Sequence, residues 1–386
     1  MQLDLGRKIR ELRHRDGRTQ EALAESVGVT PQAVSRWEAN GCYPDMEMIP
    51  AIANYFGITI DELFGYDNDR ESRIAEIIQK IEGFSIPSRS DDGWVDECLT
   101  ILRKGIAEFP QNERLLIALA DTLTEAGWRR YKEEVYYDSE GFLCGKTERH
   151  SNNEFWAEAI KICERLLQDA KDSETVTKAT RILVLLYRNT GETEKAIACA
   201  ETMPEMKNCR EIMLSFATDG RERAKKIGDL LLLTAREFSH QLVYALLADK
   251  THFESDLPIE KIKGAIALYN LICDDGNFGN RHGDLVELYL FLSCVQWMRG
   301  YHDESFVSLN KSLEHAKALE TVCDGSERTF TAPLLSLVSF RKERSEGITK
   351  NLPDDWPWWS CPVFSQAERE IKSDPRWAEW VKKTRE

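Results

Sequence analysis

The sequence lacks the long apolar runs and targeting signals that would place the chain in or across a membrane. The stretch LLLLTA at 230–235 is well short of the roughly 18 residues that a membrane span needs. Residues 1–10 have no apolar core of the kind found in secretory signals. The ten cysteines include no C-x-x-C pair and the seven histidines form no H-x3-H pair. We therefore expect a cytoplasmic protein with reduced cysteines and no bound metal.

The sequence also lacks the motifs that mark common enzyme sites. It contains no GxxxxGK[ST] phosphate loop, no GxGxxG fingerprint and no G-x-S-x-G turn. Histidine and carboxylate residues are neighbours at 282–284 and 302–304, but both places are predicted helix ends, where solvated charges are common. We expect no catalytic residues, no cofactor and no enzymatic activity.

Net positive charge is absent as well, since the 386 residues carry a formal charge of −15. Residues 1–65 contribute only −3 of this, so the acidic excess lies in the rest of the chain. Six basic residues among the first eighteen form a predicted basic edge: Arg7, Lys8, Arg10, Arg13, Arg15 and Arg18. An acidic body would repel nucleic acid in general and leave binding to specific contacts at this edge.

Residues 17–40 are the most informative stretch of the chain. They predict two short helices, over about 19–27 and 31–39, joined by a tight turn. Gly28 fits the left-handed position that closes the first helix. Thr30 is a predicted N-cap, and Pro31 suits the first helical position, where its missing N–H costs nothing. One apolar face is predicted for the pair: Leu23, Ala24, Val27, Val29, Val34 and Trp37.

The opposite face of the second predicted helix has short or hydrogen-bonding side chains and no large apolar group. Its members are Pro31, Gln32, Ala33, Ser35 and Arg36. Amide and guanidinium groups read base edges in the major groove of DNA. This face therefore predicts a DNA-reading surface.

Residues 3–65 resemble the phage-repressor (Xre/Cro-type) helix-turn-helix family. The matching motifs are LGRKIRELR at 5–13, TQEALA at 19–24, GVTPQAVSRWEANG at 28–41, IANYFG at 52–57 and IDELF at 60–64. The resemblance implies a five-helix, lambda-repressor-like domain that binds a double-stranded DNA operator as a homodimer. It also implies that Gln20 holds a phosphate, that Arg13 pairs with Glu38, and that Arg18 departs from the family's usual apolar residue. The expected DNA-binding residues are Gln20, Thr30, Pro31, Gln32, Ser35, Arg36, Arg18 and Asn40.

The remainder of the chain predicts helix after helix, with no strand alternation. We expect a linker helix and loop at 66–93, then a domain at 94–351 that resembles tetratricopeptide (TPR) repeats, which stack as an α-solenoid. Gly127, Gly191 and Gly300 are each expected to close a helix, and 128–151 is expected to be an insertion. The predicted fold class is thus all-α.

A solenoid of helix pairs offers a concave groove. Candidate groove residues are Tyr187, Arg188, Tyr244, Tyr289 and Gln296. Taken singly, each tyrosine is better explained as a half-buried packing residue than as a ligand contact. The resemblance to regulators of this layout adds a peptide as one option for the ligand.

The segment 352–386 holds five of the ten tryptophans. Its simplest interpretation is a cap over the end of the solenoid, with a dimer contact or a ligand lid as the alternative. Prolines in LPDDWPWW at 352–359 predict an extended course, and DPRWAEWVKK at 374–383 predicts a short helix with Asp374 as its N-cap.

Two functions remain open from the sequence. The first is a dimeric, sequence-specific transcriptional regulator whose helical domain senses a ligand or mediates dimerisation. The alternative is a protein-interaction scaffold or an antitoxin-like protein whose solenoid binds a protein partner.

Overall fold

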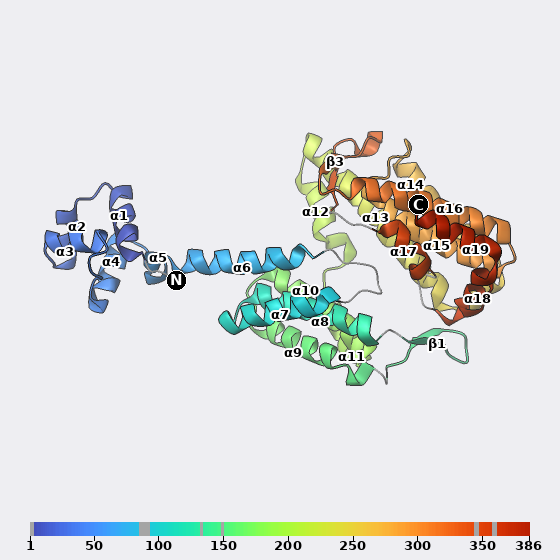
Figure 1. Ribbon diagram of the computed structural model, residues 1–386, viewed down its shortest axis with the longest axis horizontal. Coiled ribbons are helices and arrows are strands. Elements are labelled where there is room, and N and C mark those ends of the chain that lie inside the picture. The colour runs from blue at the N-terminus through green and yellow to red at the C-terminus, as the bar shows by residue number, and fades with distance from the viewer. Residues whose placement is uncertain (1–3, 85–92, 132–133, 148–149, 343–346, 357–360) are drawn as a thin grey trace. The chain divides into compact units, whose positions relative to one another are not determined.

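The computed structural model describes the chain except for residues 1–3, 85–92, 132–133, 148–149, 343–346 and 357–360 (Figure 1). The chain divides into two compact units, residues 1–83 and 84–386. Each unit has its own helices and its own apolar core, and each is described below by itself.

The N-terminal unit is a compact helical domain followed by one long helix. Its elements are α1 (Leu5–Arg15), α2 (Gln20–Val27), α3 (Pro31–Glu38), the 3-10 turn η1 (Met46–Met48), α4 (Ile49–Phe56), α5 (Ile60–Phe64) and α6 (Tyr66–Glu82). The first five α-helices enclose Ile9, Leu23, Val34, Ile52 and Leu63, all of which are fully buried. The predicted five-helix domain is confirmed.

Helix α6 begins earlier than the sequence suggested. The polar sequence GYDND at 65–69 is typical of a break between helices, but α6 already starts at Tyr66, directly after Gly65 closes α5 in a left-handed conformation with φ of 68°. One glycine is sufficient to end one helix and start the next, so the polar residues that follow it extend α6 instead of forming a loop.

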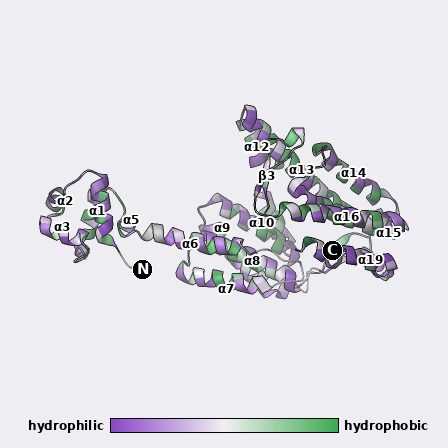
Figure 2. Ribbon diagram, turned by 45° about the horizontal axis from the view of Figure 1, so that its top comes forward, coloured by the Kyte–Doolittle hydropathy of each residue, from purple (hydrophilic) through white to green (hydrophobic). Residues whose placement is uncertain are grey.

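The first part of the C-terminal unit is a stack of antiparallel helices. Its members are α7 (Gly93–Glu108), α8 (Glu113–Tyr131), α9 (Glu154–Asp169), α10 (Ser173–Asn189) and α11 (Thr193–Glu201). Each of these helices packs against the next one in the chain, and α8 also packs against α10. Purple and green alternate along most of these helices in Figure 2, as expected for helices with one polar and one apolar face.

The second part of the unit is built around longer helices. These are α12 (Arg210–Ala217), α13 (Gly220–Ala248), α14 (Leu257–Ile272), α15 (His282–Met298) and α16 (His302–Val322). Consecutive helices again pack on one another, with α15 and α16 forming the most extensive pair. Helix α15 is buried on most sides, because its core residues face both α16 and the C-terminal segment. The predicted helical repeat architecture is confirmed.

The expectation of no strands is wrong in two places. Strand β1 (Val135–Tyr137) pairs with β2 (Leu143–Gly145), and β3 (Glu327–Thr329) pairs with β4 (Ser339–Arg341), both in antiparallel register. In the first hairpin, one carboxylate oxygen of Asp138 accepts hydrogen bonds from the backbone N–H groups of Glu140, Gly141 and Phe142. Strands of three residues are too short to show an alternating pattern, so turn chemistry decides them.

Gly127 does not close a helix, in contrast to Gly191 and Gly300, which follow α10 and α15 with positive φ. It lies inside α8, where a Cβ atom would stand 2.1 Å from the indole nitrogen of Trp156. The glycine is therefore needed for close approach of α8 to α9 and not for a turn.

The C-terminal segment packs into the core of its unit. It contains α17 (Ile348–Asp355), α18 (Ser365–Ser373) and α19 (Pro375–Thr384). The extended course expected from 352 onward is wrong for its first part, because α17 contains Pro353. Helix α19 begins where predicted, with the Asp374 side chain accepting from the N–H of Arg376. Trp358 and Trp359 lie outside the described residues.

Trp356 and Trp380 are almost fully buried and are hydrogen-bonded to neighbouring helices. The indole N–H of Trp356 donates to Ser293 Oγ at 3.0 Å, and that of Trp380 donates to the Leu309 carbonyl at 3.1 Å. These contacts to α15 and α16 favour the packing interpretation of both side chains. Among the described residues, no helix combines the length and apolar character needed to cross a membrane.

Candidate nucleic-acid interface

The turn between α2 and α3 follows the local chemistry of its residues. Thr19 caps α2 by accepting from the N–H of Ala22 at 3.2 Å, and Thr30 caps α3 by accepting from the N–H of Ala33 at 3.3 Å. Gly28 closes α2 with φ of 75°, and Pro31 occupies the first turn of α3. These caps fix the point at which α3 starts and therefore which of its side chains face outward.

A polar network under the turn fixes the orientation of α3. The guanidinium of Arg13 on α1 donates to both carboxylate oxygens of Glu38 on α3, at 2.6 and 3.0 Å. The amide of Gln20, the first residue of α2, donates to the same carboxylate at 2.7 Å. The side chains of Arg13 and Glu38 are only 11% and 4% exposed, so solvent screens this pair weakly.

The titration of these groups reflects the network. Burial raises the pKa of Glu38, but the hydrogen bonds from Arg13 and Gln20 and the charge of Arg13 outweigh it and hold the pKa below its ordinary value. The hydrogen bond to Glu38 raises the pKa of Arg13. Both groups are therefore charged around neutral pH, and α3 is locked to α1 and α2 by a charge-assisted contact.

The outer face of α3 is polar and open to solvent. Gln32, Ser35 and Arg36 are exposed, Pro31 is half-buried, and Thr30 is exposed just before the helix. The inner face carries Val34 and Trp37, both of which are buried in the domain core. The structure thus brings five of the eight predicted DNA-binding residues together on one face, at and just before the start of α3.

The other three predicted residues have partners within the domain. Gln20 donates one amide hydrogen to Glu38, and its oxygen and second hydrogen form no further hydrogen bond within the described residues. Asn40 has a left-handed backbone with φ of 56°, and its amide donates to Asp4 at 2.9 Å. The Arg18 guanidinium lies over the ring of Tyr55, 5.3 Å from its centre, and remains exposed.

The predicted basic edge is partly neutralised by neighbours. Arg7 pairs with Asp4 and Glu11, Arg15 pairs with Asp16, and Arg13 is used inside the domain. Arg10 and Arg36 are exposed and form no ion pair within the described part of the chain. Their charges are therefore available to an external anion.

The five candidate groove residues lie on three helices of the C-terminal unit. Tyr187 is buried and its hydroxyl donates to Glu164 at 2.7 Å, and neighbouring Arg188 donates to Asn189. Gln296 is buried and accepts from Ser308 at 2.6 Å, while Tyr289 stacks on His315. Tyr244 is 58% exposed. A shared ligand site for these residues remains a prediction.

Sequence reasoning missed an exposed apolar surface on α12 and α13. Phe216, Ile227, Leu231 and Phe238 are all solvent-exposed there. The signal was present in the apolar run at 230–233, which is longer than one buried helix face requires.

Comparison with known proteins places these observations in a family context. A family model described as helix-turn-helix matches residues 9–63. The HTH-type transcriptional activator BcrR of Enterococcus faecalis is 41% identical over 61 residues, which are 16% of this chain and 30% of that protein. The match thus spans less than a third of BcrR. An uncharacterised HTH-type transcriptional regulator of Archaeoglobus fulgidus is 36% identical over 62 residues, which are 16% of this chain and 89% of that protein.

Among solved structures, Bacillus thuringiensis PlcR in complex with the peptide PapR7 and DNA is 14% identical to this chain. The match covers 83% of this chain and 96% of that one, with a TM-score of 0.29. Superposition at this level does not establish a common arrangement of the helices.

Proposed function

We propose that this chain, which belongs to the helix-turn-helix family of transcriptional regulators, binds operator DNA through α3. The observation that carries the proposal is the exposed polar face of α3, whose orientation is fixed from beneath by the buried Arg13–Glu38 pair. The protein acts by binding, in the cytoplasm, and not by catalysis.

The two longest side chains on this face suit direct base reading. The guanidinium of Arg36 can donate two parallel hydrogen bonds to guanine, and the amide of Gln32 can pair with adenine. Thr30, Pro31 and Ser35 are small enough to let the backbone at the start of α3 approach the groove. The free amide hydrogen of Gln20 at the start of α2 supports a phosphate contact, since N–H groups and the dipole at a helix N-terminus favour anions.

Substitution of the base-reading residues tests the proposal. Gln32→Ala and Arg36→Ala are each expected to weaken binding to a selected operator by about 1–3 kcal/mol, with a much smaller loss on scrambled DNA. Gel-shift titration on both duplexes at one salt concentration measures the difference. Equal losses on the two duplexes would show that these residues do not read bases.

Arg181→Ala is the matched charge control. This arginine lies on α10 in the C-terminal unit, its side chain is 58% exposed, and it pairs with Asp121. The variant loses the same unit of charge as Arg36→Ala but should bind the operator like the wild-type chain.

The proposal includes two copies of the chain on a palindromic operator. Recognition helices of such dimers enter successive major grooves, about 34 Å apart. The C-terminal unit is proposed to hold the copies together and to respond to a ligand, for which a peptide is one option. Native mass spectrometry of the purified chain would detect a retained ligand, and selection from random DNA would report the half-site spacing.

A further inference from the structure

Helix α13 carries two apolar stripes, but its own fold covers only one of them. The covered stripe contains Gly228, Leu232, Ala235 and Ser239, which are buried against neighbouring elements. The second stripe lies beside it and is exposed along its whole length: Ala224, Ile227, Leu231, Thr234 and Phe238. Its members are alternately three and four residues apart, the spacing of a seam between two packed helices.

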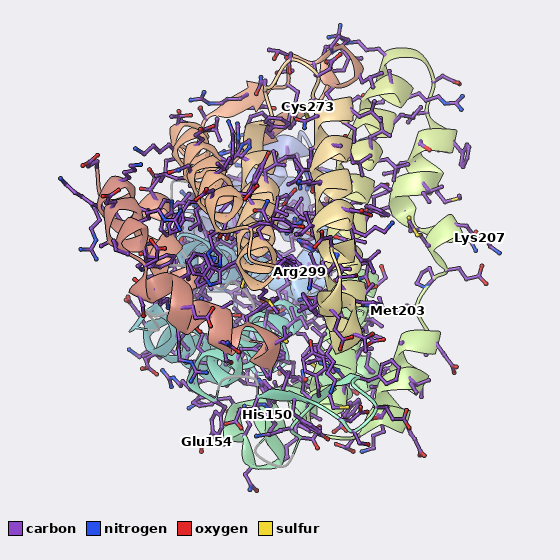
Figure 3. All side chains as sticks on the ribbon, turned by 90° about the vertical axis from the view of Figure 1, so that its right-hand side faces the viewer. His150, Glu154, Met203, Lys207, Cys273 and Arg299 are labelled. Atoms are coloured by element: carbon purple, nitrogen blue, oxygen red, sulfur yellow. The ribbon has the colours of Figure 1, made fainter. Side chains whose placement is uncertain are left out.

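The exposed stripe is not a scatter of isolated apolar residues. Phe238 is 52% exposed and Ile227 is 41% exposed, and Phe216 on the adjoining α12 is 68% exposed. Figure 3 shows the segment before α12, marked by Met203 and Lys207, at the outer edge of the unit. Apolar surface gathered in this way on a soluble protein marks an interaction site.

The charges beside the exposed stripe indicate which helix could pack against it and in which direction. Arg223 and Glu237 lie on the same flank of the stripe, two turns on either side of its centre, and neither forms an ion pair within the described residues. The start of α13 carries a net positive charge, because Arg221, Arg223 and Lys225 lie beside a Lys226–Glu222 ion pair of 3.5 Å. A second α13 running in the same direction would place these positive ends together, whereas an antiparallel one separates them.

We infer that α13 is the interface through which two copies of this chain pair, with the two helices antiparallel. In one register, Ile227 of each copy packs against Leu231 of the other, and Ala224 packs against Thr234. That register also places Arg223 of each copy beside Glu237 of the other, so that two ion pairs flank the seam. The large ring of Phe238 then faces Gly220, which has no side chain to obstruct it.

This pairing surface deepens the two-copy part of the proposed function. Its test uses no DNA, so that failure to pair through α13 and failure to bind an operator can be told apart. Self-association of the full chain is measured by sedimentation velocity over a wide concentration range.

Charge exchange gives the sharpest test. Arg223→Glu and Glu237→Arg each turn two attractive pairs into two repulsive ones, and each variant alone should dimerise at least about tenfold more weakly than wild type. Mixing the two variants restores attraction at both pairs, so a heterodimer should form with near wild-type affinity. The double variant Arg223→Glu/Glu237→Arg should also dimerise, because both pairs are re-formed with exchanged signs.

An apolar variant tests the seam itself. Leu231→Glu should also weaken dimerisation at least about tenfold, because the carboxylate would be buried in the seam against Ile227 of the other copy. Leu271→Glu on α14 is the control, since Leu271 is 72% exposed and lies off the stripe. Circular dichroism of each variant verifies that the helices remain folded.

The outcomes separate cleanly. The inference is supported if each single variant dimerises more weakly, if mixing the two charge variants restores dimerisation, and if Leu271→Glu dimerises like the wild-type chain. A wild-type chain that stays monomeric throughout, or a dimer that tolerates all of these substitutions, would overturn it, the second by showing that another surface holds the copies together.

Discussion

Glu38 is the residue on which the orientation of α3 depends. Its carboxylate receives hydrogen bonds from Arg13 and Gln20 and is almost fully buried. Removal of one partner from such a buried pair leaves the other charge without compensation, which costs more than the pair itself contributes. The contact therefore matters both for the stability of the domain and for the geometry of α3.

Glu38→Ala is expected to lower the stability of the N-terminal unit by about 3 kcal/mol, because it leaves the guanidinium of Arg13 buried and unpaired. Urea unfolding at pH 7, followed through the transition of the N-terminal unit, measures the loss. Glu11→Ala removes an exposed carboxylate of α1 that pairs with Arg7; this control should change stability by less than about 0.5 kcal/mol. A similar loss in both variants would contradict the role of burial.

The carboxylate of Glu38 should also make the stability of the N-terminal unit depend on pH, in a direction that its lowered pKa determines. The pKa of Glu38 is lowered in the folded state, so its contribution is present above the ordinary glutamate pKa of about 4.5 and is lost as pH falls through the lower folded value. Glu38→Gln should flatten the stability profile of the N-terminal unit below about pH 5. An unchanged profile would show that other carboxylates control acid unfolding.

Titration of His315 is expected to change the stability of the C-terminal unit over a different pH range. Burial lowers its pKa to about 4, with a contribution from His282, whose Nδ1 lies 2.8 Å from the Nδ1 of His315. A depressed folded pKa means that the unfolded chain takes up the proton first, so stability falls as pH drops from about 6.5 toward 4. Between pH 7 and pH 5 the loss should be about 2 kcal/mol, and His315→Phe should reduce it.

Denaturant unfolding of the C-terminal unit at the two pH values measures this effect. His14→Ala, at an exposed position in the N-terminal unit, provides the control. An undiminished pH effect in His315→Phe would assign the dependence to other groups.

At the scale of elements, two helix-interior glycines have opposite roles. Gly127 in α8 makes room for the indole of Trp156, which is fully buried in α9. At Gly264 in α14, a Cβ would meet no atom within 4 Å apart from those of the adjoining residues and the helix's own backbone. Helix propensity favours alanine at both sites, but packing opposes it at only one of them.

Gly127→Ala is expected to destabilise the C-terminal unit by about 1–3 kcal/mol through overpacking, and to shift the fluorescence of Trp156. Gly264→Ala should instead stabilise it by up to about 1 kcal/mol. Thermal unfolding of the pair measures the contrast. Two variants of equal stability would show that α8 and α9 can separate at no cost.

Local chemistry decided how far each element was predictable from the sequence. The turn between α2 and α3 was predictable because Thr30, Pro31 and Gly28 each fit one backbone position. The role of Gly127 was not predictable, because only the position of Trp156 on α9 shows that this glycine allows close packing and does not end a helix. Likewise, Asn40 presents a polar side chain in the sequence, but its contact with Asp4 depends on how α1 and α3 are placed.

The exposed seam on α13 shows the same limit at a functional surface. Periodicity identifies both apolar stripes of a helix but does not say which stripe the chain covers itself. That requires the tertiary arrangement of α13 among its neighbours, which short-range patterns do not contain.

At the scale of the whole molecule, the two compact units have separate cores and should unfold in separate steps. Glu38→Ala should shift only the transition of the N-terminal unit. Trp380→Ala should shift only the other, by about 3–5 kcal/mol, because this buried indole fills the space between α16 and α19. Scanning calorimetry resolves the two steps, and a single transition that moves with both variants would contradict independent cores.

Within the C-terminal unit, the small hairpin β1–β2 fastens parts that are distant in the chain. The hydroxyl of Tyr137 donates to the Leu247 carbonyl at the end of α13, and lies 3.3 Å from the thiol of Cys361. One phenol thus connects an insertion in the early helices to the last turn of a central helix and to the C-terminal segment. A signal that displaces one of these three parts must either move the other two with it or break the contacts of the Tyr137 hydroxyl.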